Sequence, residues 1–253
     1  MSELDGVAVV TGGTGGIGEE VARAFGAAGA SVVVADTDGD GAHAVAEAVD
    51  RRTAGSATAV ETDVTDGADA AAMVATAVDQ YGRLDAAVNN AAIAGTVAPT
   101  AEYPESEFER VLDVNLTGVY RCLKHELRAM ADQERGAVVN VASVLGRAGY
   151  ESAPAYVAAK HGVVGLTRAT AQEQADRGVR VNAVCPGFID TPMLDEVGVT
   201  TDESVQEHVK GLHPMDRFGD PREVADAIVW LCSSEASYVT GTALPVDGGY
   251  LSR

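Results

Sequence analysis

The residues of this sequence that most clearly suggest chemistry are a tyrosine and a lysine four positions apart, Tyr156 and Lys160. Residues at i and i+4 lie on one face of a helix, so this spacing places a phenol beside an ammonium group. A free phenol, with a pKa of about 10, is a weak base at neutral pH, and a neighbouring positive charge favours the phenolate. The pair therefore predicts a tyrosine that exchanges a proton with a substrate.

Two further polar residues stand where such a reaction would need them. Ser143 closes the apolar run 136–143, which has the β-branched composition of a strand. The carboxyl ends of strands in open α/β sheets face the ligand crevice, so this hydroxyl could orient a substrate oxygen. Asn115 falls inside the helical pattern 108–127, where an asparagine is mildly unfavourable. We therefore expect Asn115 to have a specific use.

A glycine-rich run, 11–18, follows directly on the apolar stretch 7–10. Glycines at a strand-to-helix turn let the backbone approach a pyrophosphate, and free N–H groups at the helix start face the anion. The run fits two spacings, Gly13-x-Gly15-x-x-Gly18 and Gly12-x-x-x-Gly16-x-Gly18. Both predict a bound dinucleotide, and with Tyr156 and Lys160 they predict a nicotinamide-dependent oxidoreductase.

The second apolar run, 31–36, ends in Asp36. A carboxylate at this strand end accepts hydrogen bonds from the ribose 2′- and 3′-hydroxyls of NAD and repels the 2′-phosphate of NADP. The residues that follow, 37–40, include no arginine or lysine that could bind that phosphate. NAD is therefore the predicted cofactor.

These residues need a framework to position them, and the sequence predicts one. Apolar β-branched runs alternate with helical segments, which implies right-handed crossovers and a parallel sheet covered on both faces. We expect a single α/β domain over residues 1–253, doubly wound and Rossmann-type, with a seven-stranded parallel sheet flanked by helices. The expected strands are 7–11, 31–36, 57–64, 84–91, 136–143, 178–185 and 243–246, and the expected helices include 17–28, 68–81, 222–231 and one that begins at Pro154. Because the long segment 190–220 lacks clear periodicity, we expect a substrate lid there.

The charge balance argues against several classes of partner. The chain has 38 acidic and 18 basic residues and a net charge of −20, and only 3 of the basic residues are lysine. A field of this sign repels phosphate backbones and anionic lipid, so neither nucleic acid nor membrane is an expected partner. The acidic excess leaves two explanations open: an arginine-favouring genome, or adaptation to high salt, where screening removes the self-repulsion.

The cysteines, the histidines and the first residues predict a cytoplasmic protein without metal chemistry. Cys122, Cys185 and Cys232 lie far apart, so neither a disulfide framework nor a Cys-x-x-Cys motif is available. The five histidines do not form the spacing that sets two imidazoles around zinc, and no metal is expected. Residues 1–6 form no basic leader, and no run of about 18 apolar residues occurs.

Taken together, these motifs resemble the short-chain dehydrogenase/reductase family nearly from end to end. Asn89-Asn90-Ala91-Ala92 is similar to the family's motif after the fourth strand, with Ala92 where the family usually has glycine. The catalytic residues that the resemblance implies are Asn115, Ser143, Tyr156 and Lys160. The cofactor-binding residues that it implies are Gly12, Thr14, Gly16, Ile17, Gly18, Asp36, Asp63, Val64, Asn90, Ala91, Tyr156, Lys160, Pro186, Gly187, Ile189 and Thr191.

The resemblance also implies roles for the four catalytic residues. Tyr156 would be the acid/base that exchanges a proton with the substrate oxygen, and Lys160 would lower its pKa and hold the nicotinamide ribose. Ser143 would polarise the substrate oxygen, and Asn115 would position a water. A homotetramer with 222 symmetry is implied as well.

The predicted activity is hydride transfer between NAD(H) and a secondary alcohol or its ketone. One alternative is an NADPH-dependent 3-oxoacyl-carrier-protein reductase, against which Asp36 and the acidic surface argue. The other is a non-catalytic NAD-binding or scaffold protein, against which the complete tetrad argues. Substrate choice is expected to depend on 96–103 and 190–218. Apolar residues in and beside these segments hint at an apolar or cyclic substrate: Ile93, Val97, Met193, Leu194 and Met215.

Overall fold

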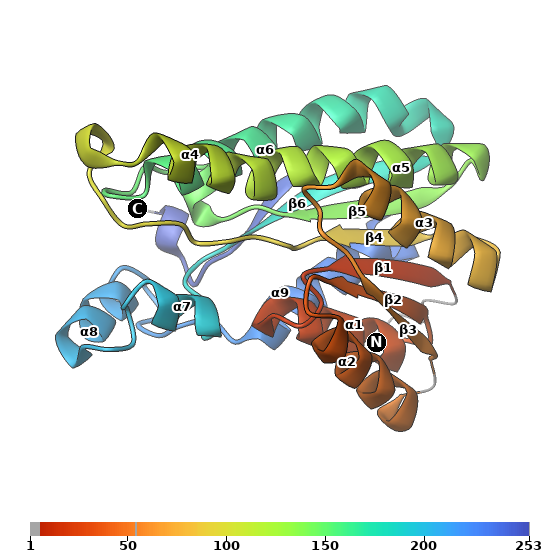
Figure 1. The fold of residues 1–253 in the computed structure, drawn as a ribbon, viewed down its shortest axis with the longest axis horizontal. Coiled ribbons are helices and arrows are strands. Elements are labelled where there is room, and N and C mark those ends of the chain that lie inside the picture. The colour runs from red at the N-terminus through yellow and green to blue at the C-terminus, as the bar shows by residue number, and fades with distance from the viewer. Residues whose placement is uncertain (1–5, 54, 253) are drawn as a thin grey trace.

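The computed structural model describes residues 6–53 and 55–252. All seven strands form one parallel sheet in the order β3-β2-β1-β4-β5-β6-β7 (Figure 1). The chain starts at β1, winds outward to β3, and then crosses to β4 on the other side of β1. The predicted fold class is therefore confirmed. The strands are β1 (Val7–Thr11), β2 (Ser31–Asp36), β3 (Ala57–Glu61), β4 (Ala86–Asn89), β5 (Gly136–Val141), β6 (Val179–Pro186) and β7 (Ala243–Val246).

Helices cover both faces of the sheet (Figure 1). One face carries α1 (Gly16–Ala27), α2 (Gly39–Arg52) and α9 (Pro221–Cys232). The other carries α3 (Gly67–Tyr81), α5 (Val119–Asp132) and α6 (Pro154–Gln174), with α4 (Glu105–Leu112) packed against α6. Because both faces are covered, the central strands are buried on both sides, and this explains their continuous apolar sequences.

Several helices begin and end at the residues that the sequence signals. Asp66 caps α3 by accepting a hydrogen bond from the Ala68 N–H, and Gly82 ends that helix with a φ of +79°. A reciprocal capping box between Asp220 and Glu223 starts α9. Pro154 occupies the first turn of α6, the helix that carries Tyr156 and Lys160.

Three expected strands are shorter in the structure, and one expected helix is interrupted. The runs 57–64, 84–91 and 136–143 leave the sheet after Glu61, Asn89 and Val141, where the chain turns into the loops beyond the strand ends. The helical pattern 108–127 is divided by a π-helical turn, Asp113–Gly118, which lies between α4 and α5. Apolar periodicity does not distinguish a π turn from an α turn, so the sequence could not predict this interruption.

The segment 190–220, expected to be irregular, contains two short helices, α7 (Pro192–Glu196) and α8 (Glu203–Gly211). They lie at one end of the molecule, apart from the helices that cover the sheet (Figure 1). Leu194, Val199 and Val209 form a small apolar core of their own in this segment.

A short parallel bridge between Ile189 and Gly219 joins the two ends of that segment. The Gly219 N–H donates to the Phe188 carbonyl, and the Asp190 N–H donates to the Gly219 carbonyl, both at 2.9 Å. The two ends of the segment therefore lie side by side, and hydrogen bonds of His213 to Phe188 and of Met215 to Gly248 also hold its last part against the body of the molecule.

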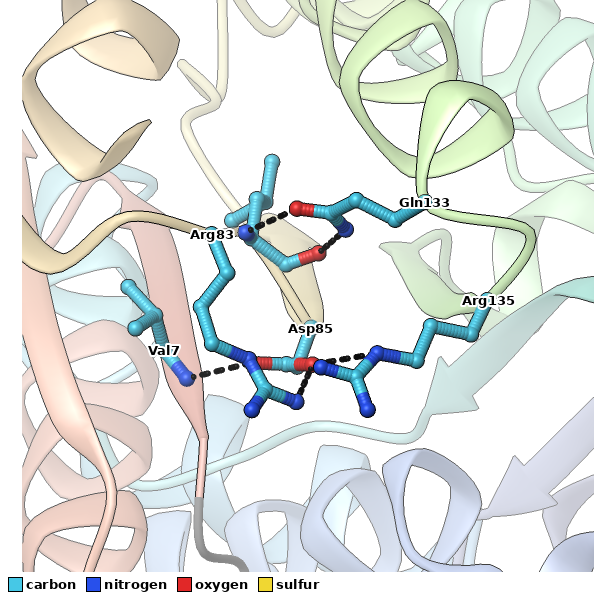
Figure 2. A network of polar contacts seen from close by, with 6 residues as sticks. Val7, Arg83, Asp85, Gln133 and Arg135 are labelled. Atoms are coloured by element: carbon cyan, nitrogen blue, oxygen red, sulfur yellow. Dashed lines mark hydrogen bonds and ion pairs between the residues drawn. The ribbon is translucent and has the colours of Figure 1, made fainter. Parts of the chain in front are cut away.

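Asp85 directly precedes β4 and lies beside the first residue of β1, at the centre of a network of polar contacts (Figure 2). Its Oδ2 accepts the Val7 N–H at 2.9 Å, and its Oδ1 forms ion pairs with Arg83 and with Arg135, the latter at 3.6 Å. Gln133 pairs with both backbone groups of the residue before Asp85, at 2.9 and 2.7 Å. These contacts tie the start of β4 to β1 and to the end of α5.

No described helix is both long enough and apolar enough to cross a membrane. Residues 1–5, which contribute to the expectation that no basic leader is present, lie outside the described residues.

Candidate active site

A cavity of about 280 Å³ opens at the carboxyl ends of β4, β5 and β6. It brings together residues that lie far apart in the sequence. The predicted site residues that line it are Ile17, Asn90, Ser143, Tyr156, Lys160, Pro186, Gly187, Ile189 and Thr191.

Tyr156 lies in the first turn of α6 and lines the cavity. Burial raises the pKa of Tyr156 to about 12, and a hydrogen bond with Ser143 partly offsets that rise. Ser143 follows the end of β5, and its Oγ accepts the Leu145 N–H at 3.1 Å. The tyrosine and serine hydroxyls therefore meet at the place where a substrate oxygen could accept hydrogen bonds from both.

Lys160 is 2% exposed, and its Nζ donates to the Val141 carbonyl at 2.8 Å. The Nζ lies 5.5 Å from the centre of the Tyr156 ring. Burial lowers the pKa of Lys160 to about 8, so its positive charge is costly in this environment. Burial therefore dominates, and the pKa of Tyr156 is raised although the sequence suggests that Lys160 lowers it.

Asn115 is fully buried in the π-helical turn and does not line the cavity. Its Oδ1 accepts the Ile93 N–H at 2.9 Å, and its Nδ2 donates to the Ile93 carbonyl at 2.8 Å. The asparagine thus satisfies both backbone groups of a residue in the loop after β4, which would otherwise lack partners. The use that the sequence predicted for Asn115 includes fixing this loop.

The glycine run forms a tight turn that favours the wider of its two possible spacings. Gly12 has a φ of +62°, and a Cβ on Gly18 would collide with the Gly12 carbonyl oxygen. A Cβ on Gly16 would lie 2.7 Å from the Thr191 methyl, whereas a Cβ on Gly15 would be in ordinary contact at 3.6 Å. Gly12, Gly16 and Gly18 therefore require glycine, and so does Gly13, where a Cβ would lie 2.6 Å from a Val34 methyl; Gly15, which only the narrower spacing needs, does not.

Asn90 fixes the same turn from the neighbouring strand. Its Nδ2 donates to the Gly12 carbonyl at 2.9 Å and to the Thr11 carbonyl at 3.2 Å. The Thr11 hydroxyl in turn accepts the backbone N–H groups of Asn90 and Ala91. The turn is preorganised, and no described side chain caps the first N–H groups of α1, so the residues present fit a dinucleotide.

Asp36 stands beside this turn at the end of β2. Its Oδ2 accepts from the N–H and the hydroxyl of Thr14, and its Oδ1 accepts the Asp38 N–H at 3.1 Å. A carboxylate has about four acceptor positions. The Thr37 hydroxyl also reaches Oδ1, at a long 3.5 Å, so ribose hydroxyls would bind Asp36 in place of this weak contact.

Two predicted cofactor-binding residues, Asp63 and Val64, do not line the cavity. Asp63 lies beyond the end of β3 and accepts hydrogen bonds from the N–H and hydroxyl of Thr65. Val64 is buried, and its side chain packs against Gly118. Ile93 and Met215, two of the apolar residues named from the sequence, also lie outside the cavity lining.

Several features of the site could not be predicted from the sequence. The Val141 carbonyl that holds Lys160 is a backbone atom, and any residue could supply it. Tyr150, Glu151 and Phe188 line the cavity, but they come from loops without periodicity.

A family model described as enoyl-(acyl carrier protein) reductase matches residues 12–251. The cis-4-hydroxycyclohexanecarboxylate dehydrogenase of Sinomonas cyclohexanicum is 45% identical, with 96% of both chains covered. The cyclohexanol dehydrogenase of Acinetobacter sp. (strain SE19) is 42% identical over 98% of this chain and 95% of its own length. The chain belongs to the short-chain dehydrogenase/reductase family.

Solved structures agree with this membership. The crystal structure of levodione reductase superposes with a TM-score of 0.91 at 38% identity and covers 96% of both chains. That of NAD⁺-bound xylitol dehydrogenase has a TM-score of 0.90 at 31% identity and covers 96% of this chain and 98% of its own. As a short-chain dehydrogenase/reductase, the chain is an oxidoreductase that interconverts a secondary alcohol and a ketone.

Proposed function

We propose that this short-chain dehydrogenase/reductase is an NAD-dependent dehydrogenase of uncharged alicyclic secondary alcohols. The observation that carries the proposal is the make-up of the cavity, which combines the hydroxyls of Ser143 and Tyr156 with a wall of mostly apolar side chains. That wall is formed mainly by Val97, Val144, Leu145, Phe188, Met193, Leu194, Val197 and Val199. An apolar wall suits a hydrocarbon ring, and the two hydroxyls suit a single ring oxygen substituent.

The proposed roles follow from where the polar atoms lie. Tyr156 exchanges the proton with the substrate oxygen, and Ser143 polarises that oxygen from the adjacent position. Lys160 holds the nicotinamide ribose and stabilises the phenolate, and Asn115 keeps its family role of positioning a water. A bound nicotinamide supplies or accepts the hydride. The enzyme's own contribution is to orient the reacting groups.

Asp36 and its surroundings support NAD as the cofactor. Its carboxylate stands at a strand end where an adenosine ribose would lie, with only the weak Thr37 contact to displace, and residues 37–40 offer no cation for a 2′-phosphate. The remaining cofactor contacts are proposed at the glycine turn, at Asp63 and Val64, and at 186–191.

Glu151 supports an uncharged substrate. It lines the cavity, and its charge adds to burial in raising the pKa of Tyr150. Among the described residues that line the cavity, Lys160 is the only cation, and its ammonium is held against the Val141 carbonyl. A substrate carboxylate would therefore meet a negative charge and no free positive one.

We also propose that 190–220 is the substrate lid, that the enzyme is a homotetramer, and that it is cytoplasmic. Leu194, Val197 and Val205 of the segment line the cavity, which supports a lid. Exposed aromatic residues on α5, on α9 and just after α9 support association: Tyr120, Trp230 and Tyr238. Free, buried Cys122, Cys185 and Cys232 fit a reducing compartment.

The test is steady-state kinetics with NAD⁺ on cyclohexanol, an acyclic secondary alcohol, xylitol and cis-4-hydroxycyclohexanecarboxylate. We expect kcat/KM for cyclohexanol to exceed that for xylitol and for the carboxylate by at least about tenfold. NADPH-dependent reduction of a 3-oxoacyl thioester with no oxidation of cyclohexanol would favour the carrier-protein reductase. NADH binding without turnover of any alcohol would favour a non-catalytic protein.

A further inference from the structure

A row of four buried polar side chains lies beneath the candidate active site. Glu126, Asn140 and Thr167 are fully buried, and Asn89 is 2% exposed. The Asn89 Nδ2 donates to Glu126 Oε2 and to Asn140 Oδ1, both at 3.0 Å. The Asn140 Nδ2 donates to the Thr167 hydroxyl at 2.9 Å, and that hydroxyl donates to the Val163 carbonyl at 2.8 Å. The row crosses from α5 through β4 and β5 to α6.

Each member of the row lies on an element that carries a residue of the site. Asn89 directly precedes Asn90, which fixes the glycine turn. Asn140 directly precedes Val141, whose carbonyl holds Lys160. Thr167 lies two turns after Lys160 on α6, and Glu126 lies on the helix that continues from the π turn of Asn115. Movement within the row would therefore reach the cofactor turn and the catalytic lysine together.

At one end of the row, two buried acceptors have no hydrogen-bond donor among the described residues. Glu126 Oε1 and Asn89 Oδ1 are both buried and have no hydrogen-bond donor, and in the described chain no cation is paired with Glu126. Unsatisfied buried acceptors are costly, and an unpaired buried carboxylate is costlier still. A single proton on Glu126 resolves both problems, because a carboxylic acid and a primary amide can pair through two hydrogen bonds. The acid O–H would donate to the amide oxygen, and the amide N–H would donate to the acid carbonyl.

We propose that Glu126 is a positioning residue held as the neutral carboxylic acid, and that its proton fixes Asn89 and so braces β4 and β5 beneath the active site. The proton orients the Asn89 amide, and the amide keeps both of its N–H groups for Glu126 and Asn140. Loss of the proton places a negative charge beside the Asn89 oxygen and weakens the row.

The surroundings of Glu126 support this assignment. Burial raises the pKa of Glu126 to about 7, and the hydrogen bond from Asn89 works in the opposite direction. The titratable group that faces it on its own helix is the Cys122 thiol, whose pKa is raised first by burial and then by Glu126. Asn89 on β4, Asn140 on β5 and Thr167 on α6 are uncharged at any pH of interest.

The sign of the pH effect follows from linkage. A carboxyl group whose pKa is higher in the folded than in the unfolded protein binds more protons when folded. Stability from Glu126 is therefore fully present below the unfolded pKa of about 4.5 and is lost as the pH rises through about 7. A glutamine keeps the shape and the donor of the neutral acid but cannot ionise.

The test compares the wild type with Glu126→Gln and Glu126→Leu, in melting temperature and in kcat/KM with NAD⁺ and cyclohexanol from pH 5.5 to 8.5. At pH 5.5 we expect Glu126→Gln to match the wild type within about twofold in kcat/KM, and Glu126→Leu to lose about tenfold. From pH 5.5 to 8.5 both measures of Glu126→Gln relative to wild type should rise: the difference in melting temperature should grow up to about pH 7 and then level off, and the kcat/KM ratio should have its midpoint near the pKa of Glu126.

The matched control is Val119→Ala, which removes buried volume two turns earlier on the same helix. It should lower the melting temperature by an amount that does not vary with pH. If Glu126→Gln is as impaired as Glu126→Leu at pH 5.5, or if its ratios to wild type are flat across the pH range, the proposal is wrong. Because the melting temperature and the glutamine variant carry the test, it stands even if Glu126→Leu does not fold or the substrate is a different alcohol.

Discussion

One oxygen of Asp36, Oδ2, accepts both the N–H and the hydroxyl of Thr14, at 3.0 and 2.8 Å. This pair of hydrogen bonds ties the end of β2 to the glycine turn, so the carboxylate is already oriented before a cofactor binds. Preorganisation of this kind avoids an ordering cost on binding, and it aims one negative charge at a fixed position.

Cofactor preference should depend on that charge. We expect the wild type to favour NAD over NADP by at least about tenfold in kcat/KM, or about 1.4 kcal/mol, and Asp36→Ala to lose most of the preference. The exposed Asp40→Asn, which removes a nearby charge from the first turn of α2, serves as the control and should keep it. Equal use of both cofactors by the wild type would refute this role of Asp36.

Tyr156→Phe should remove nearly all turnover, because the ring still packs but no proton can be exchanged. We expect kcat below about a tenth of the wild-type value and NADH affinity, measured by fluorescence titration, within about twofold. Tyr150→Phe removes a different hydroxyl from the same cavity and should retain turnover. Similar losses in both variants would mean that Tyr156 is not the acid/base.

Substrate charge should be controlled at Glu151. We expect Glu151→Arg to raise kcat/KM for cis-4-hydroxycyclohexanecarboxylate about tenfold while changing that for cyclohexanol by less than threefold, because only the charged substrate senses the reversal. Glu151→Gln should lie between. Since Glu151 is exposed, the gain should shrink when salt is added. An equal gain for both substrates would point to a change in cavity shape instead.

The oligomeric state can be measured by light scattering coupled to size exclusion. We expect four times the 25.9 kDa of one chain. Trp230→Glu or Tyr120→Glu should shift the mass to dimers or monomers if those exposed rings lie in interfaces. A monomeric mass for the wild type across a range of salt would exclude the tetramer.

Salt should stabilise the enzyme if its acidic surface is an adaptation to high salt. A net charge of −20 per chain repels itself, and the Debye length falls from about 10 Å at 0.1 M to about 3 Å at 1 M. We expect the melting temperature and the activity to rise between 0.1 and 3 M KCl. Flat or falling curves would leave genome composition as the explanation.

The sequence predicted the fold and much of the site because local signals determine both. Valine-rich runs and helix caps specify the alternation of elements, and the glycine spacing specifies a turn that has little freedom. It could not predict the π turn at Asn115, because the apolar pattern is the same in either helical geometry. It also could not predict that burial outweighs Lys160 in setting the pKa of Tyr156, because desolvation depends on how the whole cavity closes.

The buried row at Glu126 escaped sequence reasoning for a related reason. Glu126, Asn140 and Thr167 each look like ordinary polar residues, and only the sheet order brings β4 beside β5 and places α5 and α6 on the same face. The lack of donors for Glu126 Oε1 and Asn89 Oδ1 within the described chain can be recognised only once the positions of all four elements are known.

The single bridge between Ile189 and Gly219 has a consequence for engineering and for divergence among relatives. Segments of other lengths can be grafted at this bridge, at an entropic cost that grows only with the logarithm of length, provided that the graft keeps Thr191 and the hydrogen bonds of His213 to Phe188 and of Met215 to Gly248. Met193, Leu194, Val197 and Val199 would be replaced as a set, whereas the glycine turn and the tyrosine–lysine pair lie outside the graft. The specificity of one relative should therefore be transferable to another as an exchangeable cassette, without redesign of the reaction centre.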